Sequence, residues 1–300
     1  MTMRTIFLIL LLCNSSIIFA QDDLLALVDK GDSNKKEYVT SAFKSSRVIN
    51  NHSMEFIGKG VMDVRILHRF GTVDNGISDL FGLDEANMRL GFDFGLSKNL
   101  TIGFGRSNTK KEYDGFIKYR LIRQATGGNG ASPISLVIVS GLTISSVSIP
   151  DSIKTENAFT DRMAFYNELI IGRKFSEKFS LQLSPIFVHR NLAPYNLKKE
   201  AHEENNIFAL GLGTRLKITN RMAIVLDYDY IISGLYKDIY KNPLGIGIDI
   251  ETGGHVFQLH FSNSVGMNEK EFITNTTDSW GEGEIRFGFN LSRVFNIGKH

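Results

Sequence analysis

Cysteine is almost absent from this chain of 300 residues, which contains one, Cys13. It lies in an N-terminal segment with the layout of a cleavable secretory signal: a basic start, an apolar core over residues 6–12, and a small residue at Ala20. We expect cleavage near Ala20, which would leave a mature chain with neither a disulfide nor a cysteine metal site. Acylation of Cys13 is a weaker alternative, because Leu12 precedes it where a small residue is normally required.

Long apolar runs and an excess of one charge are also missing. After residue 20 no stretch approaches the roughly 18 consecutive apolar residues of a membrane-spanning helix. The chain has 34 basic and 32 acidic residues, a formal charge of +2, which argues against a nucleic-acid partner. No paired His or Cys spacing suggests zinc, so we expect no metal and no cofactor.

The chain does contain many segments in which apolar residues alternate with polar or small ones. Because successive side chains of a strand point to opposite faces, such a segment has one apolar face and one polar face. A sheet with one face in contact with hydrocarbon must close on itself, since an open edge would leave backbone groups unpaired in lipid. The pattern is clear over residues 87–96, where the apolar set is Met88, Leu90, Phe92, Phe94 and Leu96, and the other set is Asn87, Arg89, Gly91, Asp93 and Gly95.

About twelve such segments follow one another, an even number as expected of a single-chain bacterial barrel. Short turns and longer connections alternate between them, although residues 124–133 are long for a turn. A soluble β-sandwich would also alternate, but its apolar face would point inward and would need no aromatic girdle. The predicted strands are 61–70, 87–97, 99–107, 112–123, 134–145, 162–175, 179–189, 206–217, 221–232, 244–251, 255–263 and 284–295.

The fold class we predict is all-β: a transmembrane antiparallel β-barrel with short periplasmic turns and longer outer loops. It would be closed by pairing of residues 61–70 with 284–295. The predicted organisation is a signal peptide over 1–20, a periplasmic N-terminal arm over 21–56 and the barrel over 57–300. The arm does not follow the strand pattern, and the sequence leaves open whether it is a linker, a plug or a docking segment.

Several stretches resemble an uncharacterised β-barrel family of Bacteroidota, known only as a domain of unknown function. The resemblance implies an outer-membrane barrel and supplies no activity or ligand. It rests on Ala42-Phe43-Lys44-Ser45-Ser46-Arg47-Val48-Ile49-Asn50, Gly58-Lys59-Gly60-Val61-Met62-Asp63-Val64-Arg65-Ile66, His68-Arg69-Phe70-Gly71, Phe81-Gly82-Leu83-Asp84, Asn87-Met88-Arg89-Leu90-Gly91, Gly105-Arg106-Ser107, Tyr113-Asp114-Gly115 and Glu251-Thr252-Gly253-Gly254-His255-Val256-Phe257-Gln258-Leu259.

Charged residues share one parity of the predicted strands, so we expect them to line the lumen. The plainest interpretation is structural ion pairing, for example Asp63 and Arg65 beside Glu284 and Arg286 on the neighbouring last strand. The alternative is a polar pathway or a binding cavity. The lumen-lining candidates are Asp63, Arg65, Arg89, Asp93, Lys118, Arg120, Glu168, Arg215, Asp227, Asp229, Asp249, His260, Glu284 and Arg286.

Two functions remain open for a cell outer-membrane barrel of this kind. The first is passage or binding of a small polar solute through the charged lumen. The second is a membrane anchor or assembly partner for periplasmic or surface proteins, gripping a periplasmic partner through residues 21–56. Outer-membrane lipid is the expected surroundings in both cases.

An enzyme is the least favoured possibility. A hydrolase would need a general base at the outer rim, and the best set is Asp227, Asp229 and His260. No second acid aligns with His260, so we predict no catalytic residues. The glycine-rich stretch over 125–130 precedes a strand and not a helix, which indicates a flexible turn and not a phosphate loop.

Overall fold

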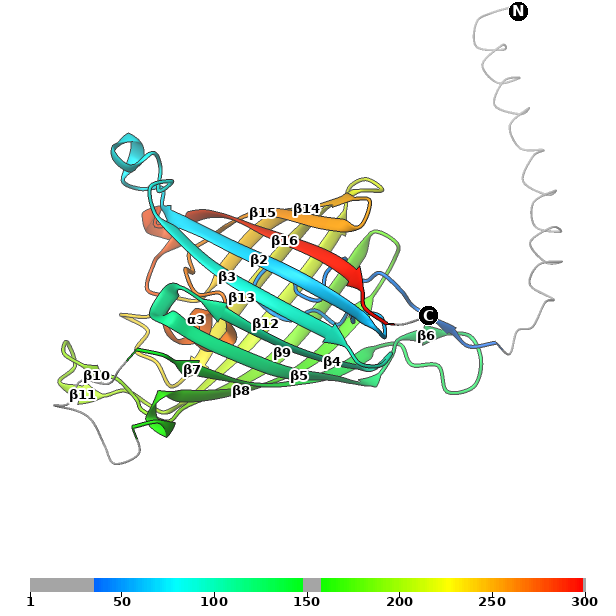
Figure 1. The fold of residues 1–300 in the computed structure, drawn as a ribbon, viewed down its shortest axis with the longest axis horizontal. Coiled ribbons are helices and arrows are strands. Elements are labelled where there is room, and N and C mark those ends of the chain that lie inside the picture. The colour runs from blue at the N-terminus through cyan, green and yellow to red at the C-terminus, as the bar shows by residue number, and fades with distance from the viewer. Residues whose placement is uncertain (1–34, 148–157, 299–300) are drawn as a thin grey trace, which may run out of the picture.

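A computed structural model describes residues 35–147 and 158–298 of the chain. The expected signal peptide and the first part of the arm lie outside these residues. Twelve antiparallel strands form a closed barrel, and the chain order is preserved around the wall (Figure 1). The strands are β2 (Val61–Thr72), β3 (Ala86–Gly95), β4 (Leu100–Ser107), β5 (Glu112–Ile122), β7 (Ser135–Ser145), β8 (Met163–Lys174), β9 (Phe179–Arg190), β12 (Asn206–Lys217), β13 (Met222–Ser233), β14 (Leu244–Thr252), β15 (His255–Ser262) and β16 (Arg286–Asn296).

The predicted fold class is confirmed, and each predicted strand differs from the observed one by at most two residues at either end. The first and last barrel strands close the wall, because β16 pairs antiparallel with β2. In this pairing Leu291 lies opposite Ile66 and Phe295 opposite Met62. No barrel strand is therefore left with an open edge in lipid.

The two faces of the wall differ as the alternation requires. In β2, Met62 and Val64 are partly exposed on the outer face, whereas Asp63 and Arg65 are buried. Aromatic side chains pack across neighbouring strands on the outer face, as in the stacked pair Phe92 and Phe104, whose ring centroids are 5.3 Å apart. The apolar surface faces outward, which is the arrangement that hydrocarbon requires.

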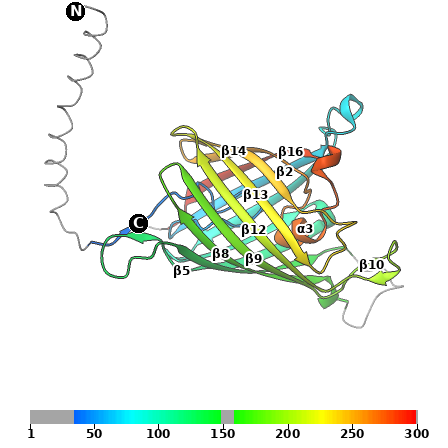
Figure 2. The same ribbon diagram turned by 180° about the vertical axis from the view of Figure 1, so that it is seen from behind.

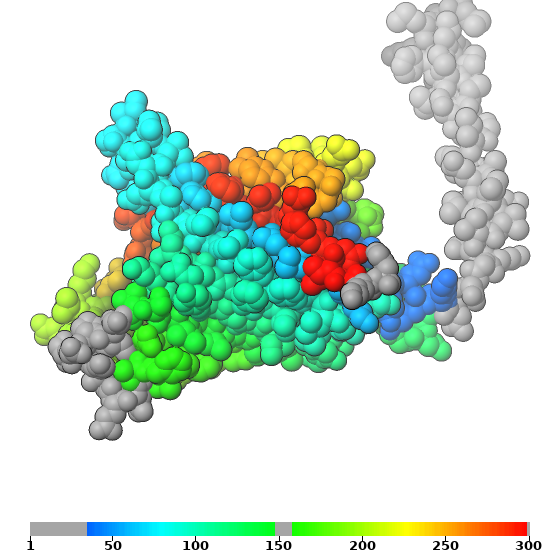
Figure 3. Space-filling view, viewed as in Figure 1, coloured from blue at the N-terminus to red at the C-terminus, as the bar shows by residue number. Residues whose placement is uncertain are grey.

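The two ends of the barrel are unlike each other (Figures 1 and 2). One end carries the short turns and, in outer-membrane barrels, faces the periplasm. The other end carries the longer connections, and the loop over residues 73–85 stands well clear of the wall there (Figure 3). These connections contain η1 (Gly76–Asp79), η2 (Thr109–Lys111), η4 (Thr160–Arg162), β10 (Tyr195–Asn196), β11 (Ala201–His202), α3 (Glu269–Thr274) and η5 (Trp280–Glu282). No helix in the described ranges is long and apolar enough to cross a bilayer.

The connection over 124–133 is long for a reason that the strand pattern does not show. Its β6 (Ala125–Thr126) pairs with β1 (Glu37–Tyr38) of the N-terminal arm. Gly127 has a φ of +65° and approaches the arm so closely that a Cβ there would lie 2.9 Å from the carbonyl oxygen of Lys35. This turn therefore holds the arm at the short-turn end of the barrel.

We predict that a charge on the outer face destabilises the barrel according to its depth. Leu210 faces outward near the middle of β12, and Leu210→Arg should cost about 2–4 kcal/mol of folding free energy. Ile218 follows the same strand at the short-turn end and is 55 % exposed, so Ile218→Arg should cost about 0–1 kcal/mol. Urea unfolding in lipid vesicles, followed by heat-modifiable gel migration, measures both. Equal losses for the two variants would show that the outer face has been wrongly assigned.

Candidate functional site: a lumen filled from both ends

The N-terminal arm enters the barrel. Residues 41–57 lie inside the wall, and Ile49, Asn51 and His52 are at most 1 % exposed. Both ends of this inserted segment stay at the short-turn end: the Thr40 carbonyl accepts from Lys174 Nζ at 3.2 Å, and the Gly60 amide donates to the Gly95 carbonyl at 2.8 Å. The segment is therefore a re-entrant loop, which we call the inner plug, and it does not thread through the barrel.

The tip of the inner plug is a compact turn. The Val48 amide donates to the Asn51 carbonyl and the Ser53 amide to the Ser46 carbonyl, each at 2.9 Å. These bonds use only part of the backbone of the turn. The remaining amides and carbonyls need partners from the wall, because an unpaired buried backbone group is costly.

Asp227 on β13 supplies the main anchor. Its Oδ2 accepts three consecutive amides, from Ile49 at 3.1 Å, Asn50 at 2.6 Å and Asn51 at 3.0 Å. The Asn51 side chain then donates to Asp227 Oδ1 at 2.7 Å and to Asp229 Oδ1 at 2.8 Å. Hydrogen bonds to a carboxylate are about twice as strong as neutral ones. Both acids thus serve to hold the plug.

Amide side chains of the wall take up other backbone groups of the plug. Gln182 on β9 accepts from the Met54 amide at 3.0 Å and donates to the His52 carbonyl at 2.6 Å. Gln258 on β15 donates to the Val48 carbonyl at 2.6 Å. These side chains replace the strand partner that an isolated loop lacks.

Basic residues hold the plug on the β2 to β5 side of the wall. Arg65 donates to the hydroxyls of Ser45 at 2.7 Å and Ser46 at 3.0 Å. Lys118 donates to the carbonyls of Ser46 at 3.2 Å and Glu55 at 2.7 Å. The charged face of the lumen is therefore occupied by polar groups of the plug.

Apolar side chains of the wall also hold the plug. Val48, Ile49 and Met54 of the plug belong to one buried cluster with wall residues of β7, β8, β9, β12 and β13. Burial of each such side chain contributes about 1.5–3 kcal/mol. The wall members of the cluster include Val137, Val139, Tyr166, Ile170, Ile186, Val188, Ile207, Ala209, Val225 and Ile231.

Glycines in the wall make room for the plug. A Cβ on Gly213 would lie 2.9 Å from Val48 Cγ2, and one on Gly172 would lie 2.5 Å from Met54 Sδ. Side chains at these two positions would collide with the plug at distances that real Cβ contacts do not reach. The inner surface of the wall is thus shaped to receive this segment.

A second segment, residues 263–285, enters from the long-loop end, and we call it the outer plug. Its helix α3 buries Phe272 and Ile273 against the apolar cluster. The wall holds it through Lys270 Nζ, which lies 2.6 Å from Glu112 Oε1 on β5. Burial by itself would raise the pKa of Glu271, but the nearby Lys270 and Lys110 ammonium groups lower it below its usual range. Glu271 therefore remains charged beside Lys270.

The two plugs meet inside the barrel. Arg47 of the inner plug donates to Glu269 of the outer plug, with 2.5 Å between NH1 and Oε1, and both side chains are 1 % exposed. His52 Nε2 lies 3.2 Å from the same carboxylate oxygen, and the His52 ring packs edge-on against Phe116 of β5 at 4.4 Å. The arm and an outer loop are thus joined by a buried ion pair.

Thirteen of the fourteen lumen-lining candidates are buried, but Glu284 is not among them. Glu284 precedes β16 and accepts from the Ser279 amide within the outer plug at 2.8 Å. Elsewhere the candidates meet one another or new partners: Arg89 with Asp114, Arg120 with the Lys98 carbonyl, Arg215 with Glu251, Asp249 with Gln258, and Glu168 with Lys118 through electrostatic interaction.

The expected pairing of Asp63 and Arg65 with Glu284 and Arg286 is wrong. Because β16 runs antiparallel to β2, the start of β16 lies beside the end of β2. Asp63 instead accepts from Ser292 at 2.6 Å and lies 3.3 Å from Arg65 of its own strand. Arg286 pairs with Asp278 of the outer plug.

The residues considered for catalysis are not assembled into a site. Across the intervening strand β14, His260 is in register with Val225, because Gly247 pairs with both. His260 is therefore two residues out of register with Asp227. Both oxygens of Asp227 are occupied by the inner plug. Within residues 35–147 and 158–298, no three His, Cys, Asp or Glu side chains gather as a metal ion would require.

Several residues that hold the plugs were missed in the sequence, although their parity pointed to them. Arg69 has the same parity as Arg65, and it donates to the Asn50 side chain at 2.9 Å. Glu112 and Asp114 share the parity of Lys118 in the same strand. By contrast, nothing periodic in the arm marked Arg47 as an interior residue.

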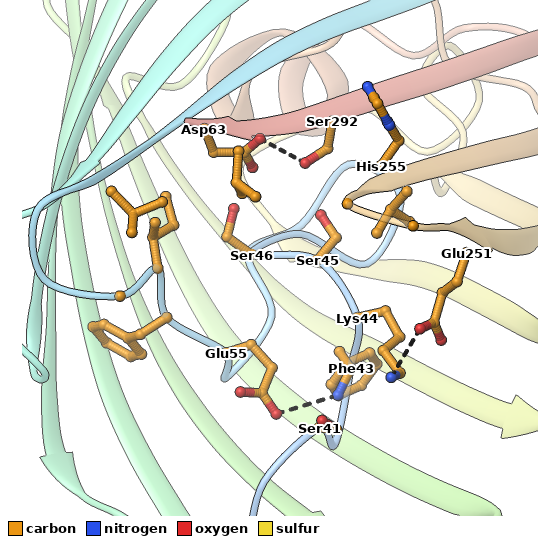
Figure 4. A pocket seen from close by; sticks show the side chains of 18 residues that line it. Ser41, Phe43, Lys44, Ser45, Ser46, Glu55, Asp63, Glu251, His255 and Ser292 are labelled. Atoms are coloured by element: carbon orange, nitrogen blue, oxygen red, sulfur yellow. Dashed lines mark hydrogen bonds and ion pairs between the residues drawn. The ribbon is translucent and has the colours of Figure 1, made fainter. Parts of the chain in front are cut away.

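A cavity of about 600 Å³ remains at the short-turn end, between the inner plug and the wall strands β2, β14, β15 and β16 (Figure 4). Lys44 lies 3.0 Å from Glu251 at one side of it, and Glu55 accepts from the backbone amide of Phe43 at the other. Hydroxyls of Ser45 and Ser46 also line this space. The lumen is thus open to solvent only as far as the plug.

Solved structures share the architecture. The NanC porin has a TM-score of 0.50 at 8 % identity, over 79 % of this chain and 100 % of that one. The KdgM porin has a TM-score of 0.47 at 9 % identity, over 78 % and 99 %, and an outer-membrane channel from Pseudomonas putida F1 has 0.48 at 14 %, over 81 % and 98 %. At 8 % identity the likeness to the NanC porin concerns the fold alone.

No curated protein shows significant sequence similarity to this chain. A family model described as a membrane-bound β-barrel domain, DUF5777, matches residues 43–295. The match begins at Phe43, so it includes nearly all of the inner plug, and it extends to Phe295 in the last strand of the wall. The chain belongs to this family of membrane-bound β-barrel domains.

Proposed function

We propose that this protein is a gated outer-membrane channel for small polar solutes, closed at rest by the inner and outer plugs. The observation that carries the proposal is that both plugs are re-entrant. Residues 41–57 enter and leave at the short-turn end, and residues 263–285 connect β15 to β16 at the other end. Either segment can withdraw without breaking a strand pair of the wall.

The wall exposed by withdrawal would suit a polar solute, because charged side chains line it. Arg65, Arg89, Asp93 and Lys118 face inward from β2, β3 and β5, and Asp227 faces inward from β13. Glycines at Gly172 and Gly213 would leave open space where the plug now lies. Charges of both signs favour solutes that carry several polar groups over purely apolar ones.

Opening requires an external input. The three amides on Asp227 would each lose a charge-assisted hydrogen bond, worth about 1.5–3 kcal/mol, unless water replaces it. The apolar side chains of the plug would also lose their burial. The closed state therefore dominates until a solute, or a partner acting on the arm, favours the open one.

A second candidate function is a closed anchor that docks a periplasmic protein. The observation in its favour is β1, which pairs with β6 outside the barrel and presents the arm at the short-turn end. A permanently filled lumen suits an anchor better than a channel. We propose no catalytic role in either case.

Planar-bilayer conductance separates the two functions. Gly213→Leu combined with Gly172→Leu should prevent the inner plug from seating, because the new side chains occupy its space. The outer plug then loses the ion pair between Arg47 and Glu269 and should be loosened as well, so that steady channels form. Gly115→Leu is the matched control, since a Cβ at Gly115 would have no atom within 3.5 Å. Folded but non-conducting double variants, together with non-conducting protein that lacks residues 35–57, would favour the anchor.

The contact between the plugs predicts that a change in an outer loop loosens the arm. Ser53→Cys gives a buried reporter thiol in the inner plug that closely matches serine in size. In that background, Glu269→Gln should raise the rate of labelling by a soluble maleimide about tenfold or more, because Arg47 loses its charged partner. Glu282→Gln is the control, since Glu282 lies in the same loop but is exposed. Labelling at the parent rate in Glu269→Gln would mean that the plugs are energetically independent.

A further inference from the structure

A separate cavity of about 430 Å³ lies at the rim of the short-turn end, outside the inner plug. It is built from three parts of the chain that the β1–β6 pairing brings together: the arm, the turn after β3, and the end of β5 with the loop after it. Its cationic residues are Lys36, Lys98, Arg120 and Arg123. None of the described residues that line it carries a carboxylate.

The arm side of this cavity, which we call the rim pocket, is held in place by specific contacts. Lys36 Nζ donates to the Gly130 carbonyl at 2.7 Å and lies 5.4 Å from the centre of the Tyr38 ring. Arg123 lies 5.0 Å from the same ring and donates to the Val39 carbonyl at 3.3 Å. Two cations thus contact the same aromatic ring, whose π face attracts both.

Arg120 is the most deeply buried cation of the rim pocket. Its side chain is 8 % exposed, its guanidinium stacks at 4.1 Å from the centre of the Phe56 ring, and NH1 donates to the Lys98 carbonyl at 3.2 Å. Its buried Nε has no hydrogen-bond partner among the described residues. The carboxylate that acts on Arg120 electrostatically is Glu55, whose Oε1 already accepts from the amides of Ala42 and Phe43. A buried guanidinium donor without an acceptor favours an anionic ligand.

The wall beside the rim pocket faces lipid. The register of β5 against β7 shifts between Arg120 and Ile122, a β-bulge of the kind that occurs at barrel rims. As a result Leu121 and Ile122 are both exposed, at 48 % and 39 %, while Arg120 remains buried. A cationic pocket at the rim is therefore flanked directly by an exposed apolar surface.

We propose that the rim pocket binds the phosphate headgroup of an anionic phospholipid from the periplasmic leaflet, with its acyl chains against Leu121 and Ile122. Arginine matches the geometry of phosphate oxygens, and clustered basic side chains at a membrane face are suited to anionic lipid headgroups. The glycine-rich turn contributes Gly130 and Ser132 to the pocket wall. Because Lys36 and Tyr38 belong to the arm, a bound lipid would also fix β1 at the rim. This site does not depend on the proposed channel function.

Native mass spectrometry of the purified full-length barrel tests the proposal with phosphatidylglycerol and phosphatidylcholine as probes. The parent should retain one phosphatidylglycerol in preference to phosphatidylcholine. The double variant Lys98→Gln, Arg123→Gln should weaken that retention about tenfold or more. The control is the double variant Lys178→Gln, Arg221→Gln at other short turns, which should leave the retention unchanged. Heat-modifiable migration of each variant verifies that the barrel is folded.

Three results would overturn the assignment. The first is equal retention of the two lipids by the parent, and the second is equal loss in the pocket and control variants. The third is displacement of the lipid by millimolar inorganic phosphate, which would show a site for free phosphate without a lipid contribution. Should the Lys98 and Arg123 pair fail to fold, Lys36→Gln alone, on the arm and outside the wall, gives the same comparison with a smaller expected loss.

Discussion

Hydrocarbon offers no hydrogen-bond partners, and most of this structure follows from that constraint. The wall closes by pairing β16 with β2, because any open edge would leave a row of unpaired backbone groups in lipid. Closure creates a second requirement. Many inward-facing residues of the wall are glycines, so the inward side chains of the twelve strands do not fill the space that the strands enclose. The inner plug and the outer plug meet that requirement, and each does so from its own end of the barrel.

The plug can occupy this interior because the wall offers it two different environments. Polar side chains of the wall, among them Asp227, Gln182 and Gln258, take up backbone groups that a lone loop cannot pair. Apolar side chains of the wall form a cluster that Val48 and Ile49 join and that would otherwise lie open. The family match begins within this segment, at Phe43, so the plug is part of the domain and not an appendage to it.

The strands could be predicted from the sequence because their signal is local: each residue's parity determines whether it faces lipid or lumen. The same parity places Asp63, Arg65, Lys118 and Asp227 inside. Partner choice depends instead on register, and the pairing of Asp63 and Arg65 with Glu284 and Arg286 failed because antiparallel strands bring opposite ends together. The sequence left the role of the arm open between a linker, a plug and a docking segment, since a loop that contacts six or more strands in turn has no period of its own.

The contact between Arg47 and Glu269 couples the two plugs energetically. Removing one partner of a buried ion pair leaves the other charge without compensation, at a cost of about 3–5 kcal/mol. Withdrawal of the inner plug alone would impose that cost on the outer plug, and the reverse also holds. Since coupling between two sites is reciprocal, an outer ligand that moves residues 263–285 must change the affinity of the lumen for residues 41–57. A closed barrel wall can thus connect its short-turn end with its long-loop end through the segments it encloses.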